Sequence, residues 1–252
     1  MKHLKGSLLA FTICGALFHS IDAEVKAEPP ELCGTTSTAT DAFQWEQIKI
    51  IHKEFTEKKP EQKVAYPQLS GLPNAGVQQR INALLREKAA YQAEADSRPL
   101  ISYANEYRVT LQSGPILNIL YKNYAFTGGA HGMPHQTSLL LDLTDGNRYA
   151  LKDLFQPGAD YQQKISQIIK QQDKDHQLDT FQPFVKIDPD ESFYLTPDSL
   201  VIFFPPYKYT PYYFGFPEFK IPYRQLSGIL KADSKVWKQV LKRPKRSPNP
   251  SQ

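Results

Sequence analysis

Two stretches of the chain carry apolar residues at helical spacing. Apolar side chains recur every three or four positions from Ala75 to Ala95, which predicts an amphipathic helix with one buried face. Arg98-Pro99 ends this helix, because proline disfavours helical backbone in the residue before it. The same period returns at Tyr161 and predicts a second helix that runs to about Asp173. Two short helices are expected near the C-terminus, over 224–230 and 234–241.

Runs rich in β-branched and aromatic residues, separated by Gly, Pro, Asn and Asp turns, predict antiparallel strands. The expected extended segments are 45–55, 64–67 (ending at its proline), 100–112, 116–126, 136–143, 148–151, 192–195 and 199–204. Ser113-Gly114-Pro115 joins two of them into a hairpin, and Asp145-Gly146 supplies the positive φ values of another tight turn.

Helices and antiparallel strands thus occur in separate blocks, which predicts an α+β fold with helices packed on one side of an antiparallel sheet. The order of helix followed by sheet occurs twice along the chain. We therefore expect two halves, 43–138 and 139–230, that share one layer.

The first 23 residues have the layout of a secretory signal peptide. Lys2 and Lys5 form a basic start, a short apolar run extends from Gly6 to Phe18, and Ala23 offers a small residue for cleavage. We expect an exported protein of the periplasm, the cell wall or the extracellular medium. An uncleaved membrane anchor is the alternative, although the apolar run is short for a membrane span.

The segment 24–42 is rich in Pro, Thr, Ser and Ala and predicts a flexible leader. Cleavage after Ala23 would leave Cys33 as the single cysteine, which excludes an internal disulfide. Its thiol is then either free or paired between two chains.

Charge is unevenly distributed along the chain. The net charge is +4, yet 24–230 carries −3, because 231–252 holds seven Lys or Arg and one Asp. This basic C-terminal helix and tail suggests contact with anionic wall polymers or a membrane surface, and a solubilising role is the alternative. The acidic body remains free to meet cationic partners. An exported chain without a basic face inside its fold does not point to nucleic acid.

The most specific motif is Tyr124-Ala125-Phe126-Thr127-Gly128-Gly129-Ala130-His131-Gly132. Glycine pairs occur where the backbone needs positive φ or a close approach, so the motif predicts a defined corner after a strand. The motifs that follow it, in order, are Leu141-Asp142-Leu143-Thr144-Asp145-Gly146, Leu151-Lys152-Asp153-Leu154-Phe155, Phe203-Phe204-Pro205-Pro206-Tyr207, Pro211-Tyr212 and Phe219-Lys220-Ile221-Pro222-Tyr223. This ordered series resembles the DUF4163/DUF3298 pair of domains over roughly Val64 to Ile229.

The resemblance implies a cell-envelope setting. Domains of this family form the ectodomain of lysozyme-sensing anti-sigma factor V and a non-catalytic part of certain peptidoglycan deacetylases. The first half would then be DUF4163-like and the second DUF3298-like. Only five residues precede the apolar segment at the N-terminus, so we expect no cytoplasmic anti-sigma domain. What remains is the ectodomain function, which is binding of lysozyme or wall glycan.

Motifs that carry chemistry are few. The sequence lacks a Gly-x-Ser-x-Gly elbow, a phosphate-binding glycine-rich loop with Lys, a His-Glu-x-x-His helix and a Cys-x-x-Cys pair. His131 and His135 have the spacing of a zinc pair, but Gly132 and Pro134 break the helix that would align their rings. Catalytic zinc also needs a third protein ligand. We expect no catalytic residue, no metal and no cofactor.

Three roles for His131 stay open: a structural tie from the corner to a carbonyl or carboxylate, a contact with a ligand, and catalysis in a wall-polymer hydrolase or deacetylase. Asp142, Asp145 and Asp153 suggest a carboxylate pair for glycoside cleavage. Two of the three lie in turn signals that already explain them, which weakens that hypothesis.

The second candidate surface is the proline-rich segment 205–213, which carries four tyrosines. Rigid aromatic side chains of this kind stack on sugar rings or anchor protein interfaces, and packing over an open sheet face is the equal alternative. The predicted binding residues are Gly128, Gly129, His131, Tyr207, Tyr209, Tyr212 and Tyr213.

We therefore expect an exported, non-enzymatic binding module of the cell envelope that recognises lysozyme or peptidoglycan glycan. The alternatives are a hydrolase or deacetylase that uses His131, and a purely structural envelope protein. Lysozyme is strongly basic and would favour the acidic body, with an affinity that falls as salt rises. Glycan binding would depend on the tyrosines and would respond less to salt.

Overall fold

The computed structural model describes residues 43–93, 98–176 and 180–242. The predicted signal peptide, the leader with Cys33 and the end of the basic tail lie outside these residues. In chain order the described elements are η1 (Trp45–Gln47), β1 (Lys49–Lys58), β2 (Glu61–Ser70), α1 (Ala75–Ala89), β3 (Ser102–Ser113), β4 (Ile116–Phe126), β5 (Met133–Asp142), η2 (Leu151–Leu154), α2 (Tyr161–His176), β6 (Phe193–Leu195), β7 (Ser199–Phe203), η3 (Tyr212–Phe214), β8 (Glu218–Pro222), η4 (Tyr223–Leu226) and α3 (Lys235–Val240), where η marks a 3-10 helix.

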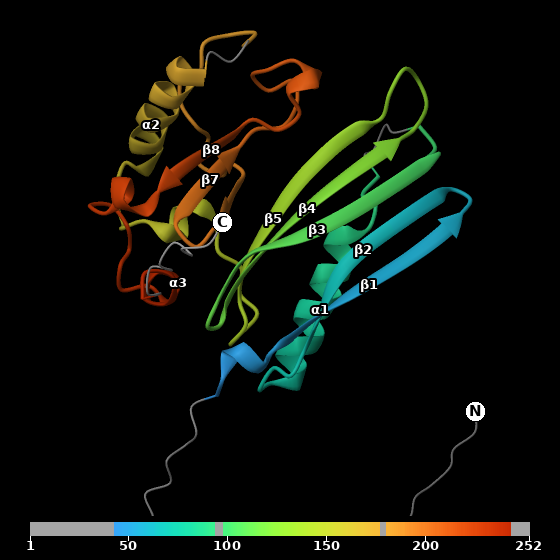
Figure 1. Ribbon diagram of the computed structural model, residues 1–252, viewed down its shortest axis with the longest axis horizontal. Helices are drawn as coiled ribbons and strands as arrows, with labels where there is room; N and C mark the ends of the chain where they lie inside the picture. Colours follow the sequence, from blue (N-terminus) through green and yellow to red (C-terminus); the bar gives the residue numbers. More distant parts are fainter. Residues whose placement is uncertain (1–42, 94–97, 177–179, 243–252) are drawn as a thin grey trace, which may run out of the picture. The chain divides into compact units, whose positions relative to one another are not determined.

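The first sheet contains five strands in the order β1-β2-β3-β4-β5 (Figure 1). Neighbouring strands are antiparallel except β2 and β3, which pair in parallel over 61–64 and 102–105. Parallel neighbours need a crossover connection, and α1 lies within it. The hairpin predicted across Ser113-Gly114-Pro115 is confirmed by the antiparallel pairing of β3 with β4.

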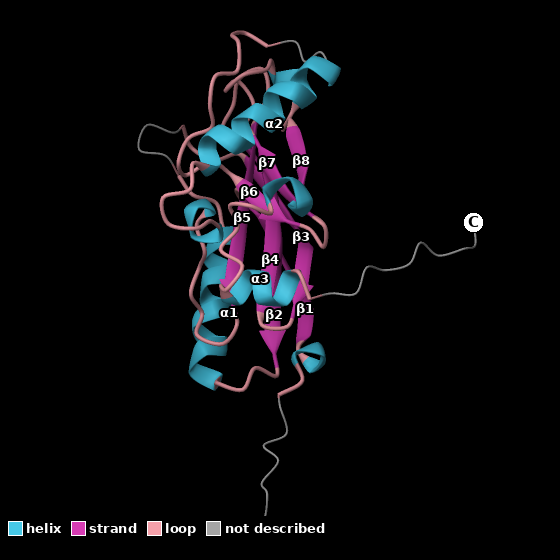
Figure 2. Ribbon diagram, turned by 90° about the vertical axis from the view of Figure 1, so that its left-hand side faces the viewer, coloured by secondary structure: helices cyan, strands magenta, loops and turns pink. Residues whose placement is uncertain are grey.

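Helix α1 packs on one face of this sheet (Figures 1 and 2). Its predicted apolar stripe, which includes Ile81 and Leu85, is buried in a cluster with side chains of β2, β4 and β5. The Tyr121 hydroxyl donates a hydrogen bond to the Leu85 carbonyl at 3.0 Å. The Asn82 amide exchanges two hydrogen bonds with the backbone of Leu69, at 2.7 and 2.9 Å. Apolar contact and these polar bonds together fix the helix on the sheet.

The opposite face of the first sheet carries the second sheet, β6-β7-β8, in which all pairs are antiparallel. Leu120 of β4 is buried among Tyr194, Val201 and Phe203 of this second sheet. Ile202 has the opposite orientation on β7 and belongs to the cluster that includes α2. The α+β class is confirmed, but the two halves form stacked sheets in place of one shared layer.

The reason for stacking lies in β4. Its first six residues, Ile116–Tyr121, are all buried, so this strand must be covered on both faces. Between the sheets, the buried Asn118 side chain joins the two layers. Its Nδ2 donates to the Leu139 carbonyl at 2.9 Å, and its Oδ1 accepts a hydrogen bond from the Leu195 N–H at 2.6 Å.

Helix α1 is shorter than predicted and ends at Ala89 instead of Ala95. Ala90 already has extended backbone, with ψ of 153°. The Gln92 side chain then donates a hydrogen bond to the Glu87 carbonyl at 3.2 Å, which satisfies one acceptor at the helix end.

Other strand boundaries also differ from the predictions. β2 continues through Pro67, because its pairing with β3 has already ended at Val64 and the proline therefore removes no hydrogen bond between them. The predicted return strand 148–151 is reduced to a single bridge between Leu141 and Arg148, after which η2 begins. β8 was not predicted as a strand. The predicted boundary between the halves, at 138/139, falls inside β5.

Candidate binding site

Steric constraints and a hydrogen bond determine the backbone conformation of the glycine-rich corner between β4 and β5. Gly128 and Gly129 have φ of +97° and +100°, in the left-handed region that favours glycine. A Cβ at Gly132 would lie 2.5 Å from the Ala125 carbonyl oxygen and 2.6 Å from the Tyr124 ring, so a side chain does not fit there. The Gly132 N–H donates to the Tyr124 hydroxyl at 2.7 Å.

The tyrosine segment, 205–213, is anchored by a lysine. Lys208 Nζ lies 2.8 Å from carboxylate oxygens of both Asp188 and Glu191, and the Glu191 side chain is only 3% exposed. Burial alone would lower the pKa of Lys208, but its hydrogen bonds to the two acids outweigh burial and raise the pKa. Tyr207 has a φ of +68°, which is uncommon for a residue with a side chain.

The structure brings the corner and the tyrosine segment together. The Tyr212 hydroxyl donates to the Gly132 carbonyl oxygen at 3.2 Å, and His131 Nδ1 lies 2.8 Å from the same oxygen. The Tyr212 ring centroid is 4.3 Å from that of His131 and 5.8 Å from that of Tyr207. We call the side chains of Tyr124, His131, Tyr207 and Tyr212 the aromatic surface.

The aromatic surface is open to solvent and contains no Asp, Glu, Lys or Arg side chain. Tyr124 is 40% exposed and Tyr207 is 48% exposed. Desolvation, and then the neighbouring Tyr124 hydroxyl, raise the pKa of Tyr212, so its phenol stays neutral at physiological pH. The surface therefore offers ring faces and neutral hydroxyl groups.

A groove of about 380 Å³ opens beside the corner. Its walls include Tyr91 after α1, residues 133–135 at the start of β5, and Pro205-Pro206 at the start of the tyrosine segment. Among the residues that the structure describes, none that lines it is Asp, Glu, Lys or Arg. Its volume falls within the ~300–1,000 Å³ that is usual for ligand sites.

Two of the four predicted tyrosines do not belong to the aromatic surface. Tyr209 is half-buried, and its ring lies 5.4 Å from Phe184 and 4.8 Å from Phe204, which places it in the core. Tyr213 is 71% exposed, and its ring lies 4.7 Å from Phe214. Tyr124 was not predicted as a binding residue, because no sequence spacing indicates that its hydroxyl reaches Gly132.

Histidine and acidic side chains do not gather into a metal site in the described part of the chain. No group of three or more His, Cys, Asp or Glu there could hold a metal ion. His135 lines the groove, while His131 faces Tyr212. Within the same described residues, no helix is long and apolar enough to span a membrane.

The three aspartates considered for glycoside cleavage have structural partners. Asp142 is fully buried and accepts hydrogen bonds from the Thr144 N–H at 2.9 Å and from Lys235 Nζ at 3.0 Å. Burial alone would raise the pKa of Asp142, but these hydrogen bonds outweigh it and lower the pKa. Asp145 and Asp153 each accept a backbone N–H, at 2.9 and 2.8 Å. These hydrogen bonds give each of the three aspartates a structural role in its turn.

Known families match both parts of the chain. Residues 152–224 match the family described as "Protein of unknown function (DUF3298)". The resemblance to the DUF3298 family is confirmed. Residues 54–134 match the family described as "Deacetylase PdaC", while the DUF4163 likeness of the first half stays a prediction. Within the aromatic surface, Tyr124 and His131 lie in the part that matches PdaC, and Tyr207 and Tyr212 lie in the part that matches DUF3298.

Individual proteins are also similar to this chain, in sequence or in structure. Anti-sigma-V factor RsiV of Bacillus subtilis (strain 168) is 29% identical over 186 residues, which are 66% of this chain and 64% of RsiV, so the chain spans less than two thirds of that relative. Crystal structures of DUF3298 family proteins from Pseudomonas aeruginosa PAO1 and Bacteroides fragilis NCTC 9343 have TM-scores of 0.54 and 0.56, at 22% and 18% identity. They cover 73% and 78% of this chain and 94% and 98% of their own. At these identities the likeness shows the fold.

Proposed function

We propose that this protein is an exported, non-enzymatic binding module of the cell envelope that recognises wall glycan through the aromatic surface. The observation that carries the proposal is the meeting of two candidate segments. Tyr212 lies 4.3 Å from His131 between ring centroids, and Tyr207 beside it is 48% exposed.

The chemistry of this region favours sugar over a charged partner. Aromatic rings offer apolar faces to the C–H groups of a sugar ring, and phenol hydroxyls bond to its hydroxyls. The described lining of the adjacent groove contains no Asp, Glu, Lys or Arg, and the groove adds room for neighbouring sugar units. The Lys208 contacts to Asp188 and Glu191 hold the tyrosine segment in place before binding, which lowers the entropy lost when a ligand binds.

Lysozyme is the second candidate. The 29% identity to anti-sigma-V factor RsiV favours it, together with the resemblance to the ectodomain of the lysozyme-sensing anti-sigma factor. A strongly basic partner would bind the acidic body, and salt would weaken the complex.

Deacetylation of a wall polymer is the third candidate, favoured by the PdaC match, which includes His131. Our proposal gives His131 a positioning role, because its Nδ1 lies 2.8 Å from the Gly132 carbonyl. In a deacetylase, His131→Ala would abolish a metal-dependent release of acetate from the polymer.

Calorimetric titrations with an N-acetylglucosamine tetramer and with hen lysozyme, each at low and moderate salt, separate the candidates. We expect saturable binding of the tetramer that changes little with salt and weakens about tenfold in Tyr207→Ala or Tyr212→Ala, since stacked aromatic contacts contribute on the order of 1 kcal/mol each. Phe43→Ala removes an aromatic residue that is 37% exposed outside the aromatic surface and is the matched control.

The other results are equally decisive. Salt-weakened lysozyme binding that ignores both tyrosine substitutions would replace our proposal with the second candidate. Metal-dependent acetate release that is lost in His131→Ala would replace it with the third. No heat with either ligand would retire both forms of recognition.

A further inference from the structure

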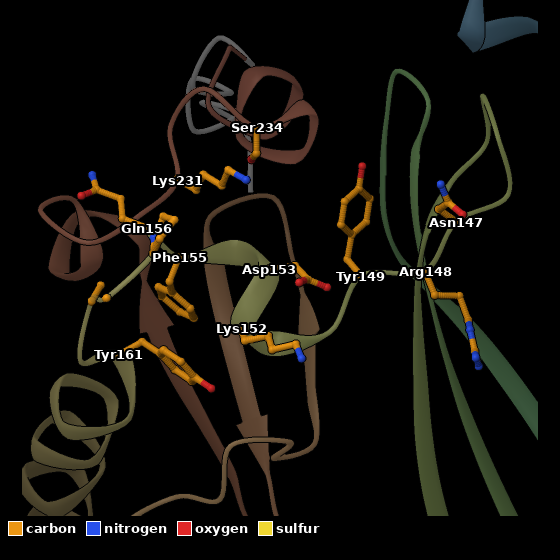
Figure 3. Close-up of a pocket in the computed structure, with 13 residues that line it drawn as sticks. Asn147, Arg148, Tyr149, Lys152, Asp153, Phe155, Gln156, Tyr161, Lys231 and Ser234 are labelled. Carbon is orange, nitrogen blue, oxygen red and sulfur yellow. The ribbon is translucent and has the colours of Figure 1, made fainter.

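A second groove lies between η2, the loop before α2 and the loop before α3 (Figure 3). Its volume is about 610 Å³, again in the range of ligand sites at ~300–1,000 Å³. We propose that this lysine groove, named for Lys152 and Lys231, binds an anionic saccharide. A sugar ring would lie along Tyr161, and acidic groups of the saccharide would pair with the lysines.

Backbone hydrogen bonds hold the walls of the lysine groove together. The Gln156 N–H donates to the Ile229 carbonyl at 2.9 Å, and the Lys231 N–H donates to the Leu154 carbonyl at 3.1 Å. The Trp237 indole N–H donates to the same Leu154 carbonyl at 2.6 Å. Because main-chain bonds link the two walls, the groove exists before any ligand binds, and little ordering is needed.

The charged groups of the groove are available to an anion. Lys152 and Lys231 are exposed, and neither has an ion-pair partner among the described residues. Lys235, in contrast, is committed to acidic partners, with Asp142 at 3.0 Å. Figure 3 shows Lys152 and Lys231 on either side of Asp153, while Arg148 points away. Two unpaired ammonium groups that line one groove favour an anionic ligand.

Asp153 makes a bare inorganic anion a poor fit and a sugar a better one. One carboxylate oxygen of Asp153 accepts the Ala150 N–H at 2.8 Å, and the other is left to accept a hydrogen bond from a sugar hydroxyl. A small anion at the lysines would be attracted by them but would also meet repulsion from this carboxylate. A saccharide carries both the acidic group for the lysines and hydroxyls for Asp153.

Aromatic side chains supply the apolar part of the groove. The Phe155 and Tyr161 rings are stacked, with centroids 4.7 Å apart and an interplanar angle of 2°. The Tyr161 hydroxyl donates to the Pro189 carbonyl at 3.1 Å, which fixes the ring. The half-exposed Tyr161 ring offers a fixed apolar surface for a sugar.

This inference is independent of the glycan proposal, because the aromatic surface shares no residue with the lysine groove. Two tetrasaccharides test the sites separately. A hyaluronan tetrasaccharide carries carboxylates on alternate sugars, and the N-acetylglucosamine tetramer carries none. We would titrate each into the full chain by calorimetry at low salt and at about 0.15 M, where charges further apart than about 8 Å are screened.

We expect the hyaluronan tetrasaccharide to bind at low salt and to weaken as salt rises. Lys152→Ala and Lys231→Ala should each weaken it about tenfold, the usual effect of losing one charge-assisted hydrogen bond. Lys238→Ala removes the same charge from an exposed position outside the groove and should bind as the wild type does. Both lysines are exposed, so loss of folding is not expected in these variants.

Four results would overturn the proposal. They are no binding of the anionic tetrasaccharide, equal binding of the neutral one to this groove, displacement by inorganic phosphate at equal concentration, and binding that survives in Lys152→Ala/Lys231→Ala. The last result would assign any anion binding to the remaining basic residues of the chain. Loss of the neutral tetramer's binding in Tyr212→Ala would bear only on the aromatic surface.

Discussion

The Tyr212 hydroxyl donates a hydrogen bond to the Gly132 carbonyl oxygen, and these residues are 80 positions apart in the sequence. This bond joins the glycine corner to the tyrosine segment. The position of this carbonyl group requires glycine at 132, since a Cβ there would lie 2.5 Å from the Ala125 carbonyl oxygen.

Gly132→Ala should therefore destabilise the protein by about 1–3 kcal/mol, the usual effect of overpacking. It should also weaken glycan binding, because the displaced carbonyl no longer positions Tyr212. Urea unfolding measures the first effect and calorimetry the second. Gly228→Ala is the control, because a Cβ there meets nothing within 4 Å, and it should stay within about 0.5 kcal/mol of the wild type. Equal effects of the two substitutions would contradict the steric account.

Tyr207 combines an unfavourable backbone with an exposed ring, at a φ of +68°. Glycine tolerates this region, whereas other residues are about 1–2 kcal/mol less stable in it. Tyr207→Gly should thus be more stable than Tyr207→Ala by about 1 kcal/mol, and both should lose glycan affinity. Thermal unfolding of the two variants checks the order. If Tyr207→Ala were the more stable, backbone strain at this position would be refuted.

Lys208 neutralises Glu191, whose side chain is 3% exposed. Lys208→Met should destabilise the protein by about 3 kcal/mol, because it leaves a buried carboxylate without its partner. Adding Glu191→Gln should recover part of the loss, since the unpaired charge is then removed. A double-mutant cycle in urea gives the coupling between the two sites. Strictly additive effects would mean that the pair does not anchor the tyrosine segment.

Asp142 should make stability depend on acid pH. Its folded pKa lies below its ordinary value, so its contribution is fully present above about pH 3.9 and is lost as the pH falls through the lower folded pKa. Asp142→Asn should start less stable at pH 7, because the pair with Lys235 is gone, and should lose less stability on acidification. Urea unfolding from pH 7 to 2 compares it with Asp190→Asn, an exposed control that should follow the wild type.

Periodic segments were predictable from the sequence, and irregular ones were not. The apolar stripe of α1 and the turn at Gly114 determine a helix and a hairpin locally, so both were found. The stacking of two sheets had a signal in Ile116–Tyr121, an apolar run interrupted only by Asn118, which is typical of a strand buried on both faces. The extended-strand pattern alone did not say what would cover the second face.

The tyrosine segment shows where sequence reasoning stops. Tyr209 and Tyr212 lie in the same proline- and tyrosine-rich segment. The ring of Tyr209 nevertheless packs in the core, whereas the ring of Tyr212 contacts His131. An irregular loop has no period that fixes side-chain direction. The direction here follows from Lys208 and its contacts with Asp188 and Glu191, which are 20 and 17 residues away in the sequence. The lysine groove was not predicted either, because its walls come from two stretches far apart in the sequence, 147–161 and 231–234.

Asn118 has a consequence for how β6 aligns. Its Oδ1 is buried and receives the N–H of Leu195. Successive N–H groups of a strand point to opposite edges, so a slip of β6 by one residue would leave this oxygen without a donor, a penalty of about 1–3 kcal/mol. The same slip would turn Tyr194 away from Leu120. A single amide in the first sheet thus discriminates against misaligned forms of a strand only three residues long.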